Sequence, residues 1–366
     1  MRSPQSFGLI EFGDAVHRIA PEDAGTRSHM RGSRPRSAVC SDIVVRSRNP
    51  NPTSDSVLRI RTVGTMSATA FRGHTKSEGS RTVRRVIDRD EIESALIAWF
   101  DAHGRTLEVR QASTPWQVLV LEVMSQQTQI DRVGSYWRAF VDRWPTPAAL
   151  AEATTHDLLR AWAGLGYNRR ALALRDAARR IVDDHHGQVP PDLNALIALP
   201  GVGPYTARAV AATAFGLPLA PVDVNVGRVV RRLAGIESGR PAIQHAADDL
   251  ISRTDPRRWI AAVMDLAATR CTRRNPACGD CPVAVWCASR GTLGDATAKS
   301  DGRRFETTNR WLRGRILAHL REARSGDWVT IEGPIGIHGR ERVAAALSAL
   351  ASEGFLVMDG DRARLA

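Results

Sequence analysis

Four of the chain's five cysteines lie within a short stretch that directly follows a helical segment: Cys271, Cys278, Cys281 and Cys287. Four thiolates at the spacing C-x6-C-x2-C-x5-C can close one metal site, and both zinc and iron–sulfur clusters accept four cysteine ligands. Disulfides are disfavoured in a chain of cytosolic character. Spacing alone therefore predicts a metal centre and leaves zinc and an iron–sulfur cluster open. Cys40 has no partner and is assigned no role.

A second chemically suggestive feature is the turn Leu-Pro-Gly-Val-Gly at 199–203, which separates two amphipathic segments. Glycines let backbone amides approach a phosphate closely, and the N-terminus of the next helix adds its dipole. Such a turn between two helices is typical of a DNA-binding helix–hairpin–helix. An ordinary tight turn between helices is the alternative reading.

Two carboxylic acids stand in unusual surroundings. Glu122 is the one acid in the apolar stretch Val-Leu-Val-Leu-Glu-Val-Met, so it either reaches solvent or is partly buried with a raised pKa, as a general acid requires. Asp223 opens a helix after Leu-Ala-Pro-Val, where it either caps the helix or stabilises a developing cation beside a cleft. Residue types alone leave both choices open.

The elements that must position these residues are helical. Apolar residues recur at helical spacing from about Val86, and no comparable strand alternation interrupts them. The sequence predicts an all-α domain over 86–290, a linker at 291–308, and a small winged-helix-like α+β module at 309–366, with helices at 309–323 and 340–353 before a hairpin. In the all-α domain the predicted helices span 87–102, 116–129, 131–143, 147–152, 155–163, 169–186, 192–198, 204–215, 223–234, 242–253 and 256–270.

Composition and charge fit a globular protein that binds a polyanion. The 366-residue chain carries a formal charge of +12, and 43% of its residues are hydrophobic. Residues 1–85 hold fourteen arginines and one lysine against seven acidic residues, which is about two-thirds of the net charge. This segment lacks a periodic apolar pattern, so we expect a disordered basic extension. It is either a dispensable leader, with Met66 as the true start, or an arm that binds DNA non-specifically.

Taken together, the motifs resemble those of the helix–hairpin–helix DNA glycosylases that carry an iron–sulfur cluster, the superfamily that includes endonuclease III. Within it, the resemblance is greatest to MutY-type adenine DNA glycosylases, and it covers about 86–290. Five motifs carry it, in the family's order: Glu122-Val-Met-Ser-Gln-Gln-Thr-Gln129, Gly164-Leu-Gly-Tyr167, the hairpin at 199–203, Val222-Asp-Val-Asn-Val226 and the four-cysteine loop.

The resemblance implies a [4Fe–4S] cluster on the four cysteines and a glycosylase that flips its target base out of DNA. Glu122 is implied as the acid that protonates adenine N7, and Asp223 as the carboxylate that stabilises the oxocarbenium-like sugar, with Tyr205 and Asn225 orienting them. The resemblance also implies the DNA contacts. A tyrosine wedges into the base stack, two glutamines fill the space of the flipped base, and the backbone amides of the hairpin hold a phosphate. An arginine stands where the family has the arginine of its Leu-Pro-Trp-Arg motif. These residues are Tyr167, Gln126, Gln127, Gly201, Val202, Gly203 and Arg110.

The expected activity depends on two motifs. Relatives of endonuclease III carry a catalytic lysine where this chain has Tyr205, so a monofunctional glycosylase is implied. Gln126 and Gln127 favour adenine, opposite 8-oxoguanine or guanine, over the thymine or uracil of related mismatch glycosylases. A non-enzymatic iron–sulfur regulator is a remote alternative. The C-terminal module differs from the larger β-rich domain with which many MutY proteins recognise 8-oxoguanine.

The expected partner is double-stranded DNA that contains a mismatch or an oxidised guanine. We expect a monomer located in the cytoplasm, at the nucleoid if the source is bacterial. The chain has no apolar run of about 18 residues and no signal peptide, so no membrane association is expected.

Overall fold

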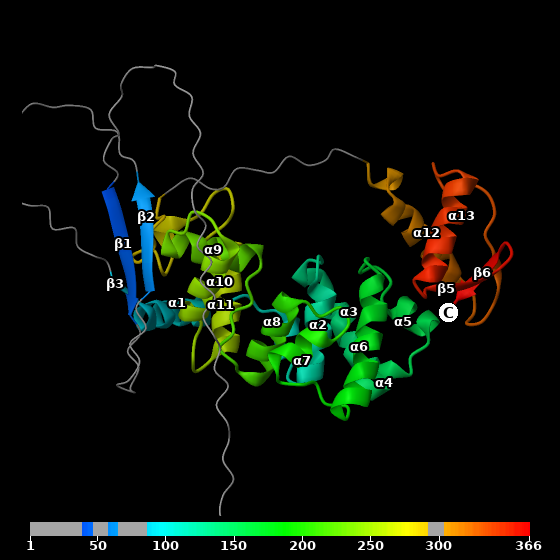
Figure 1. Ribbon diagram of the computed structural model, residues 1–366, viewed down its shortest axis with the longest axis horizontal. Helices are drawn as coiled ribbons and strands as arrows, with labels where there is room; N and C mark the ends of the chain where they lie inside the picture. Colours follow the sequence, from blue (N-terminus) through cyan, green and yellow to red (C-terminus); the bar gives the residue numbers. More distant parts are fainter. Residues whose placement is uncertain (1–38, 47–57, 65–85, 292–303) are drawn as a thin grey trace, which may run out of the picture. The chain divides into compact units, whose positions relative to one another are not determined.

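The computed structural model describes residues 39–46, 58–64, 86–291 and 304–366. The described part contains thirteen α-helices, and the predicted helical domain is confirmed (Figure 1). Their bounds are α1 Arg89–His103, α2 Pro115–Ser125, α3 Ile130–Arg143, α4 Pro147–Ala151, α5 Thr155–Ala161, α6 Arg169–His185, α7 Leu193–Ala198, α8 Pro204–Phe215, α9 Val224–Ala234, α10 Arg240–Leu250, α11 Pro256–Thr269, α12 Asn309–Glu322 and α13 Arg340–Ser352.

The helices of the 86–290 segment form two hydrophobic cores. Helices α2 to α8 build one core around large side chains such as Trp137, Phe140 and Trp162. The other core joins α1 to α9, α10 and α11, although more than a hundred residues separate α1 from α9 in the sequence (Figure 1). Glu122 lies on α2 of the first core, whereas Asp223 caps α9 of the second core. The two acids therefore come from opposite sides of the boundary between the cores.

Local signals explain where the site-bearing helices begin and end. Thr114 and Gln117 form a reciprocal capping box at the start of α2, and Pro115 occupies its first turn. The predicted continuation of this helix to residue 129 is wrong, because α2 ends at Ser125. The backbone turns there, and Gln127 takes a φ of 55°, which no α-helix accommodates.

The C-terminal module has the winged-helix-like order that the sequence predicts. After α12 and α13, strands β5 (Leu356–Asp359) and β6 (Arg362–Leu365) form the hairpin. A strand that the sequence analysis did not identify, β4 (Val329–Thr330), completes an antiparallel sheet in the order β4-β6-β5. Leu312, Phe355 and their apolar neighbours form the buried interior of the module.

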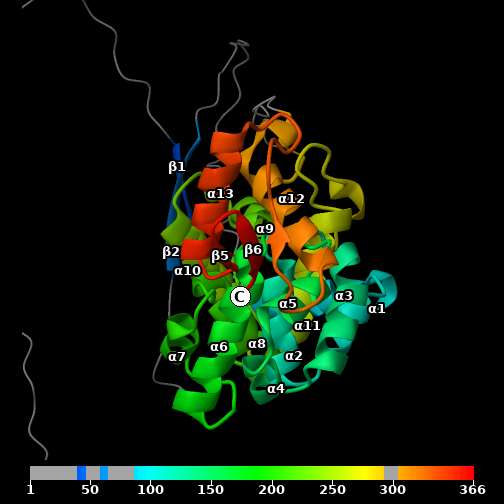
Figure 2. The ribbon, with the colours of Figure 1, turned by 90° about the vertical axis from the view of Figure 1, so that its right-hand side faces the viewer.

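The module lies beside α5, as both ribbon views show (Figures 1 and 2). His156 on α5 bonds through Nε2 to the carbonyl oxygen of Ala323, at 3.1 Å. Arg321 on α12 donates to the carbonyl oxygen of Leu159, at 3.4 Å. The His156 bond runs from α5 to the residue that follows α12, and the Arg321 bond runs from α12 to α5. Together the two bonds fix the position of α12 relative to the helical domain.

Residues 1–85 hold regular structure that the sequence analysis did not predict. Strands β1 (Val39–Arg46) and β2 (Leu58–Gly64) join β3 (Val86–Asp88) in a sheet of order β2-β1-β3, with β1 parallel to β3. Val, Ile and Thr are frequent in these segments, and such β-branched residues favour strands. The expectation of no regular structure is wrong for these strands, while the rest of 1–85 and residues 292–303 lie outside the described residues.

Within the part of the chain that the structure describes, no helix is long and apolar enough to cross a bilayer.

Candidate active site

Glu122 stands where the two hydrophobic cores meet. It follows Leu121 and precedes Val123 and Met124, all three buried on α2. Burial, and after it the negative charge of Asp223, together raise the pKa of its carboxyl from 4.5 to about 7. A carboxyl with this pKa holds its proton near neutral pH, which is the state that a general acid needs. Of the two interpretations that the sequence left open, the structure favours the partly buried acid with a raised pKa.

Asp223 is held in a fixed geometry by the start of α9. Its Oδ1 accepts hydrogen bonds from the backbone amides of Asn225, at 2.8 Å, and Val226, at 2.7 Å. Its Oδ2 accepts from the Asn225 side-chain amide, at 2.8 Å. These three donors fix the orientation of the carboxylate. Asp223 therefore is the helix cap, and in the same position it directs negative charge toward Glu122.

Tyr205, on the first turn of α8, completes the group. Burial raises the pKa of its phenol well above the ordinary value, and the nearby charges of Glu122 and Asp223 add to this effect. The hydroxyl therefore stays protonated and can donate a hydrogen bond. The structure thus brings together the four residues to which the family resemblance gives catalytic roles: Glu122, Asp223, Tyr205 and Asn225.

Arg228 connects this group to the cysteine loop. Its Nη1 donates to the Asn225 side-chain oxygen at 3.1 Å, while Nε donates to the backbone oxygen of Cys271 at 2.8 Å. A third bond, of 3.0 Å, runs from Nη2 to the backbone oxygen of Ala267 at the end of α11. One guanidinium thus fixes Asn225, and through it Asp223, relative to the first cysteine of the loop.

The residues predicted to enter the DNA stack share an unusual backbone. Gln127 and Tyr167 have φ values of 55° and 47°, and within the described residues only one other non-glycine residue, His186, has a positive φ. His186 ends α6, where a left-handed residue is common. Gln127 follows the C-cap of α2, whereas Tyr167 lies in the loop before α6. Strained backbone of this kind tends to gather at functional sites. Tyr167 is also a partly exposed aromatic residue, at 37%.

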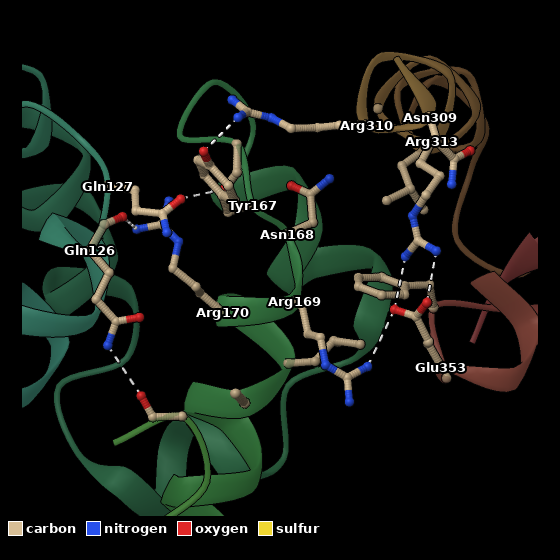
Figure 3. Close-up of a pocket in the computed structure, with 18 of the residues that line it drawn as sticks. Gln126, Gln127, Tyr167, Asn168, Arg169, Arg170, Asn309, Arg310, Arg313 and Glu353 are labelled. Atoms are coloured by element: carbon tan, nitrogen blue, oxygen red, sulfur yellow. Dashed lines mark hydrogen bonds and ion pairs between the residues drawn. The ribbon is translucent and has the colours of Figure 1, made fainter. Parts of the chain in front are cut away.

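Arg170 holds both strained segments together, as Figure 3 shows. Its Nη1 donates to the backbone oxygens of Val123, Met124 and Gln126, at 3.0, 2.7 and 2.6 Å. Its Nη2 reaches the Thr128 hydroxyl at 3.1 Å and the backbone oxygens of residues 165 and 166 at 3.2 and 3.0 Å. Burial lowers the pKa of this guanidinium to about 10, so it remains charged.

The hairpin at 199–203 shows why residue 201 is a glycine. Gly201 has a φ of 75°, and a Cβ there would lie 2.8 Å from the Cβ of Ala173. A Cβ on Gly203 would meet nothing within 4 Å, so this glycine leaves open space directly before α8. The Val202 amide already donates to the Leu199 carbonyl at 3.1 Å, so it is not available to a phosphate as predicted. Gln126 ties this hairpin to α2 through a 3.1 Å bond to the Gly201 carbonyl.

The four cysteines of the loop converge on one apolar cavity, next to Arg232 and Arg270. Burial raises the pKa of Cys281 to about 11 and raises that of Cys287, and the neighbouring thiols act in the same direction. Cationic iron would compensate the charge that these two buried thiols carry once they ionise. Arg232 adds a donor 3.5 Å from the Cys271 sulfur.

Arg110, predicted to contact DNA, is engaged within the fold instead. Its Nη2 pairs with the buried carboxylate of Asp265 at 2.8 Å, and its guanidinium lies 4.9 Å from the Phe100 ring centroid. Arg105 donates to the same carboxylate from its amide and its side chain. The structure therefore does not bring Arg110 into the group around Glu122.

Sequence reasoning missed Arg170 and Arg228. Arg169 and Arg170 occupy the first turn of α6, where a cation opposes the helix dipole and no acidic residue is present. That placement was the available signal for Arg170. Arg228 had none, because its acceptors on Asn225 and Cys271 come together only in the fold.

Comparison with known proteins identifies the family of the chain. Residues 120–253 match the family model of the HhH-GPD superfamily base excision DNA repair protein, and residues 271–287 match the iron-sulfur binding domain of endonuclease III. An adenine DNA glycosylase of Mycobacterium tuberculosis is 42% identical over 240 residues, which cover 63% of this chain and 79% of that protein. A thymine/uracil-DNA glycosylase of Pyrobaculum aerophilum is 35% identical over 216 residues, covering 56% of this chain and 94% of that protein.

A solved structure of a thermostable thymine-DNA glycosylase superposes with a TM-score of 0.53 at 26% identity, covering 55% of this chain and 96% of that chain. Fold and site together define a base-excision DNA glycosylase, an enzyme that acts on DNA. The chain belongs to the MutY-type adenine DNA glycosylase family of the HhH-GPD superfamily, and its four loop cysteines hold a [4Fe–4S] cluster.

Proposed function

We propose that the enzyme hydrolyses the N-glycosidic bond of adenine that is mispaired with 8-oxoguanine or guanine. The observation that carries this proposal is the pairing of Glu122, whose pKa is about 7, with a fully hydrogen-bonded Asp223. A carboxyl that keeps its proton beside a second carboxyl group fixed by hydrogen bonds is what acid-assisted departure of a base from its sugar requires. The adenine DNA glycosylases among the relatives support the choice of base.

In the proposed reaction, the flipped adenine enters the space beside Glu122. Glu122 gives its carboxyl proton to adenine N7, and the C1′–N9 bond breaks with its electron pair leaving on the base. Asp223 stabilises the positive charge that develops on the sugar, with Asn225 and Tyr205 holding the group in place. Water then adds its oxygen to C1′ and releases a proton to solvent. The cluster, when bound, stabilises the cysteine loop. Arg228 contacts the first residue of this loop, Cys271.

A monofunctional reaction is supported by the absence of lysine from the site. The chain contains two lysines, Lys76 and Lys299, so residues 77–298 supply no ε-amine that could form a Schiff base with the sugar. Tyr205 stands at the position where the lyases of the superfamily carry their lysine. Borohydride treatment during turnover should therefore trap no covalent protein–DNA adduct. A trapped adduct would contradict the monofunctional assignment.

The DNA face is proposed to consist of Tyr167, which wedges into the stack, and Gln126 and Gln127, which fill the vacated space. The amide of Gly203 and the first turn of α8 would hold a phosphate. Tyr167, Gln127 and Gly203 are exposed, and the half-buried Gln126 directly follows the helix that carries Glu122, which supports these roles. We further propose that the enzyme acts as a monomer in the cytoplasm, at the nucleoid if the source is bacterial.

A substrate panel tests the proposed base. Duplexes containing A·8-oxoguanine, A·G, T·G and U·G are incubated with the enzyme, and alkali-labile sites are then scored on each strand. We expect cleavage on the adenine strand of the first two duplexes. Cleavage confined to the thymine or uracil strand would instead assign the mismatch activity named for the Pyrobaculum relative.

A further inference from the structure

We propose that the C-terminal module is a second DNA-binding element, in which Arg310 and Arg315 on α12 contact backbone phosphates of the strand opposite the excised base. The DNA strand would lie in the cleft between the start of α6 and α12. This inference rests on the proposed placement of Tyr167 in the DNA stack.

The cleft is large and basic. It has a volume of about 1320 Å³ and extends from the hairpin residue Gly201 and the two glutamines to α12. The acidic residues that line it are two, Asp176 and Glu353. The arginines that line it are six: Arg169, Arg170, Arg175, Arg310, Arg313 and Arg315. A groove with an excess of fixed cations that continues a nucleic-acid face matches the chemistry of a phosphate backbone.

The wedge residue lies at the centre of this cleft. Figure 3 shows Gln126 and Gln127 on one side of Tyr167 and α12 on the other. The guanidinium of Arg310 stacks 3.9 Å from the Tyr167 ring centroid and donates to its hydroxyl. If Tyr167 enters the base stack between the two strands, the hairpin and glutamines face one strand, and α12 faces the other.

Arg310 and Arg315, both on α12, have no carboxylate partner among the described residues and can meet that second strand. Arg313 bonds both oxygens of Glu353, at 2.7 and 2.8 Å, and Arg169 reaches the same carboxylate at 3.3 Å. Arg315, by contrast, is exposed and has no ion pair with any described residue, and Arg310 contacts only aromatic rings and the tyrosine hydroxyl among those residues. Both therefore keep their charge available for phosphate.

The surfaces that a winged helix would ordinarily present are less suited to DNA. The tip of the β5–β6 hairpin carries Asp359 and Asp361, whose charge repels phosphate, and Asp359 already pairs with Arg362 at 2.8 Å. On α13, the exposed middle of the helix presents Ala344, Ala345 and Ser348, which offer few donors to a base edge. The module therefore offers DNA its α12 face rather than its hairpin or α13.

The test measures binding rather than excision, so that it stands even if adenine is not the excised base. The full-length protein, with its cluster, is titrated into duplexes that carry a tetrahydrofuran abasic analogue, at several salt concentrations. One phosphate contact contributes about 0.9 to the slope of log Kd against log salt. We therefore expect Arg310→Ala and Arg315→Ala each to lower this slope by about 0.9 and to weaken binding about eightfold at about 0.1 M salt.

Arg342→Ala on α13 is the matched control, because it removes the same charge from an exposed position of the same module. It should leave both affinity and slope unchanged. A second experiment replaces single phosphates by neutral methylphosphonates. When the replaced phosphate lies on the opposite strand near the abasic site, wild type and Arg310→Ala should no longer differ in affinity. Unchanged binding by both α12 variants, an equal loss in Arg342→Ala, or sensitivity only to methylphosphonates on the abasic strand would overturn the proposal.

Discussion

Replacing Glu122 by glutamine should stabilise the protein above neutral pH and at the same time abolish base excision. Glutamine has nearly the shape of the protonated acid, but its amide cannot transfer a proton to the base. In the folded protein the pKa of Glu122 is about 7, against an ordinary 4.5, so the folded state holds its proton through a pH range in which the unfolded chain has lost it. Raising the pH through this range therefore destabilises the native enzyme, and the variant escapes this effect.

The size of the effect follows from the two pKa values. Each unit of difference corresponds to about 1.4 kcal/mol, so the difference between 4.5 and about 7 amounts to about 3 kcal/mol in total. Between about pH 5 and about pH 8, the free energy of unfolding of Glu122→Gln should gain about 2–3 kcal/mol relative to wild type. This corresponds to a relative Tm increase of roughly 5–10 °C for a protein of this size.

Urea unfolding followed by circular dichroism measures the stability at both pH values, with the visible absorbance of the cluster recorded to show that both proteins remain loaded. Single-turnover excision measures the activity. In wild type the rate of the chemical step should fall about tenfold per pH unit above about 7, as Glu122 loses its proton. A stability difference that is the same at both pH values would refute the buried acid, and excision near the wild-type rate would refute its catalytic role.

Three further variants probe the rest of the site. Asp223→Asn keeps a good helix cap but loses the charge, so single-turnover excision should fall by about 10²–10³ at unchanged Tm; a loss below tenfold would remove Asp223 from the mechanism. Arg170→Lys keeps the charge but cannot make the fork of bonds to six acceptors, so both Tm and affinity for abasic-analogue DNA should drop. A wild-type Tm together with a wild-type affinity would show that the two turns held by Arg170 do not depend on its guanidinium. Cys278→Ala should lose the visible absorbance of the cluster and weaken DNA binding, whereas a colourless, zinc-loaded and fully active protein would contradict the cofactor assignment.

The helices could be predicted because the local signals at their ends agree with the way the helices pack in the fold. Thr114 caps α2 and Asp223 caps α9, while Gly216 and Gly235 end α8 and α9 in left-handed conformations. Each of these residues can be read from the sequence without knowledge of the fold. The same holds for the cysteine array, whose spacing already predicted a shared metal site.

Other features depend on contacts between distant segments. The six acceptors of Arg170 belong to two turns that only the fold brings together, and no spacing in the sequence announces them. Arg110 matched a family position, yet the buried charge of Asp265, far along the chain, engages its guanidinium. The contact between Arg310 and Tyr167 likewise depends on how the C-terminal module docks against α5.

The most direct test of the catalytic account is single-turnover release of free base from an A·8-oxoguanine duplex by wild type and by Glu122→Gln. Wild type should release adenine and leave a strand that breaks only after alkali, while the glutamine variant should bind the duplex and release nothing. Adenine release by the variant at a rate near wild type, or failure of wild type to release adenine while it acts on T·G or U·G, would contradict the account.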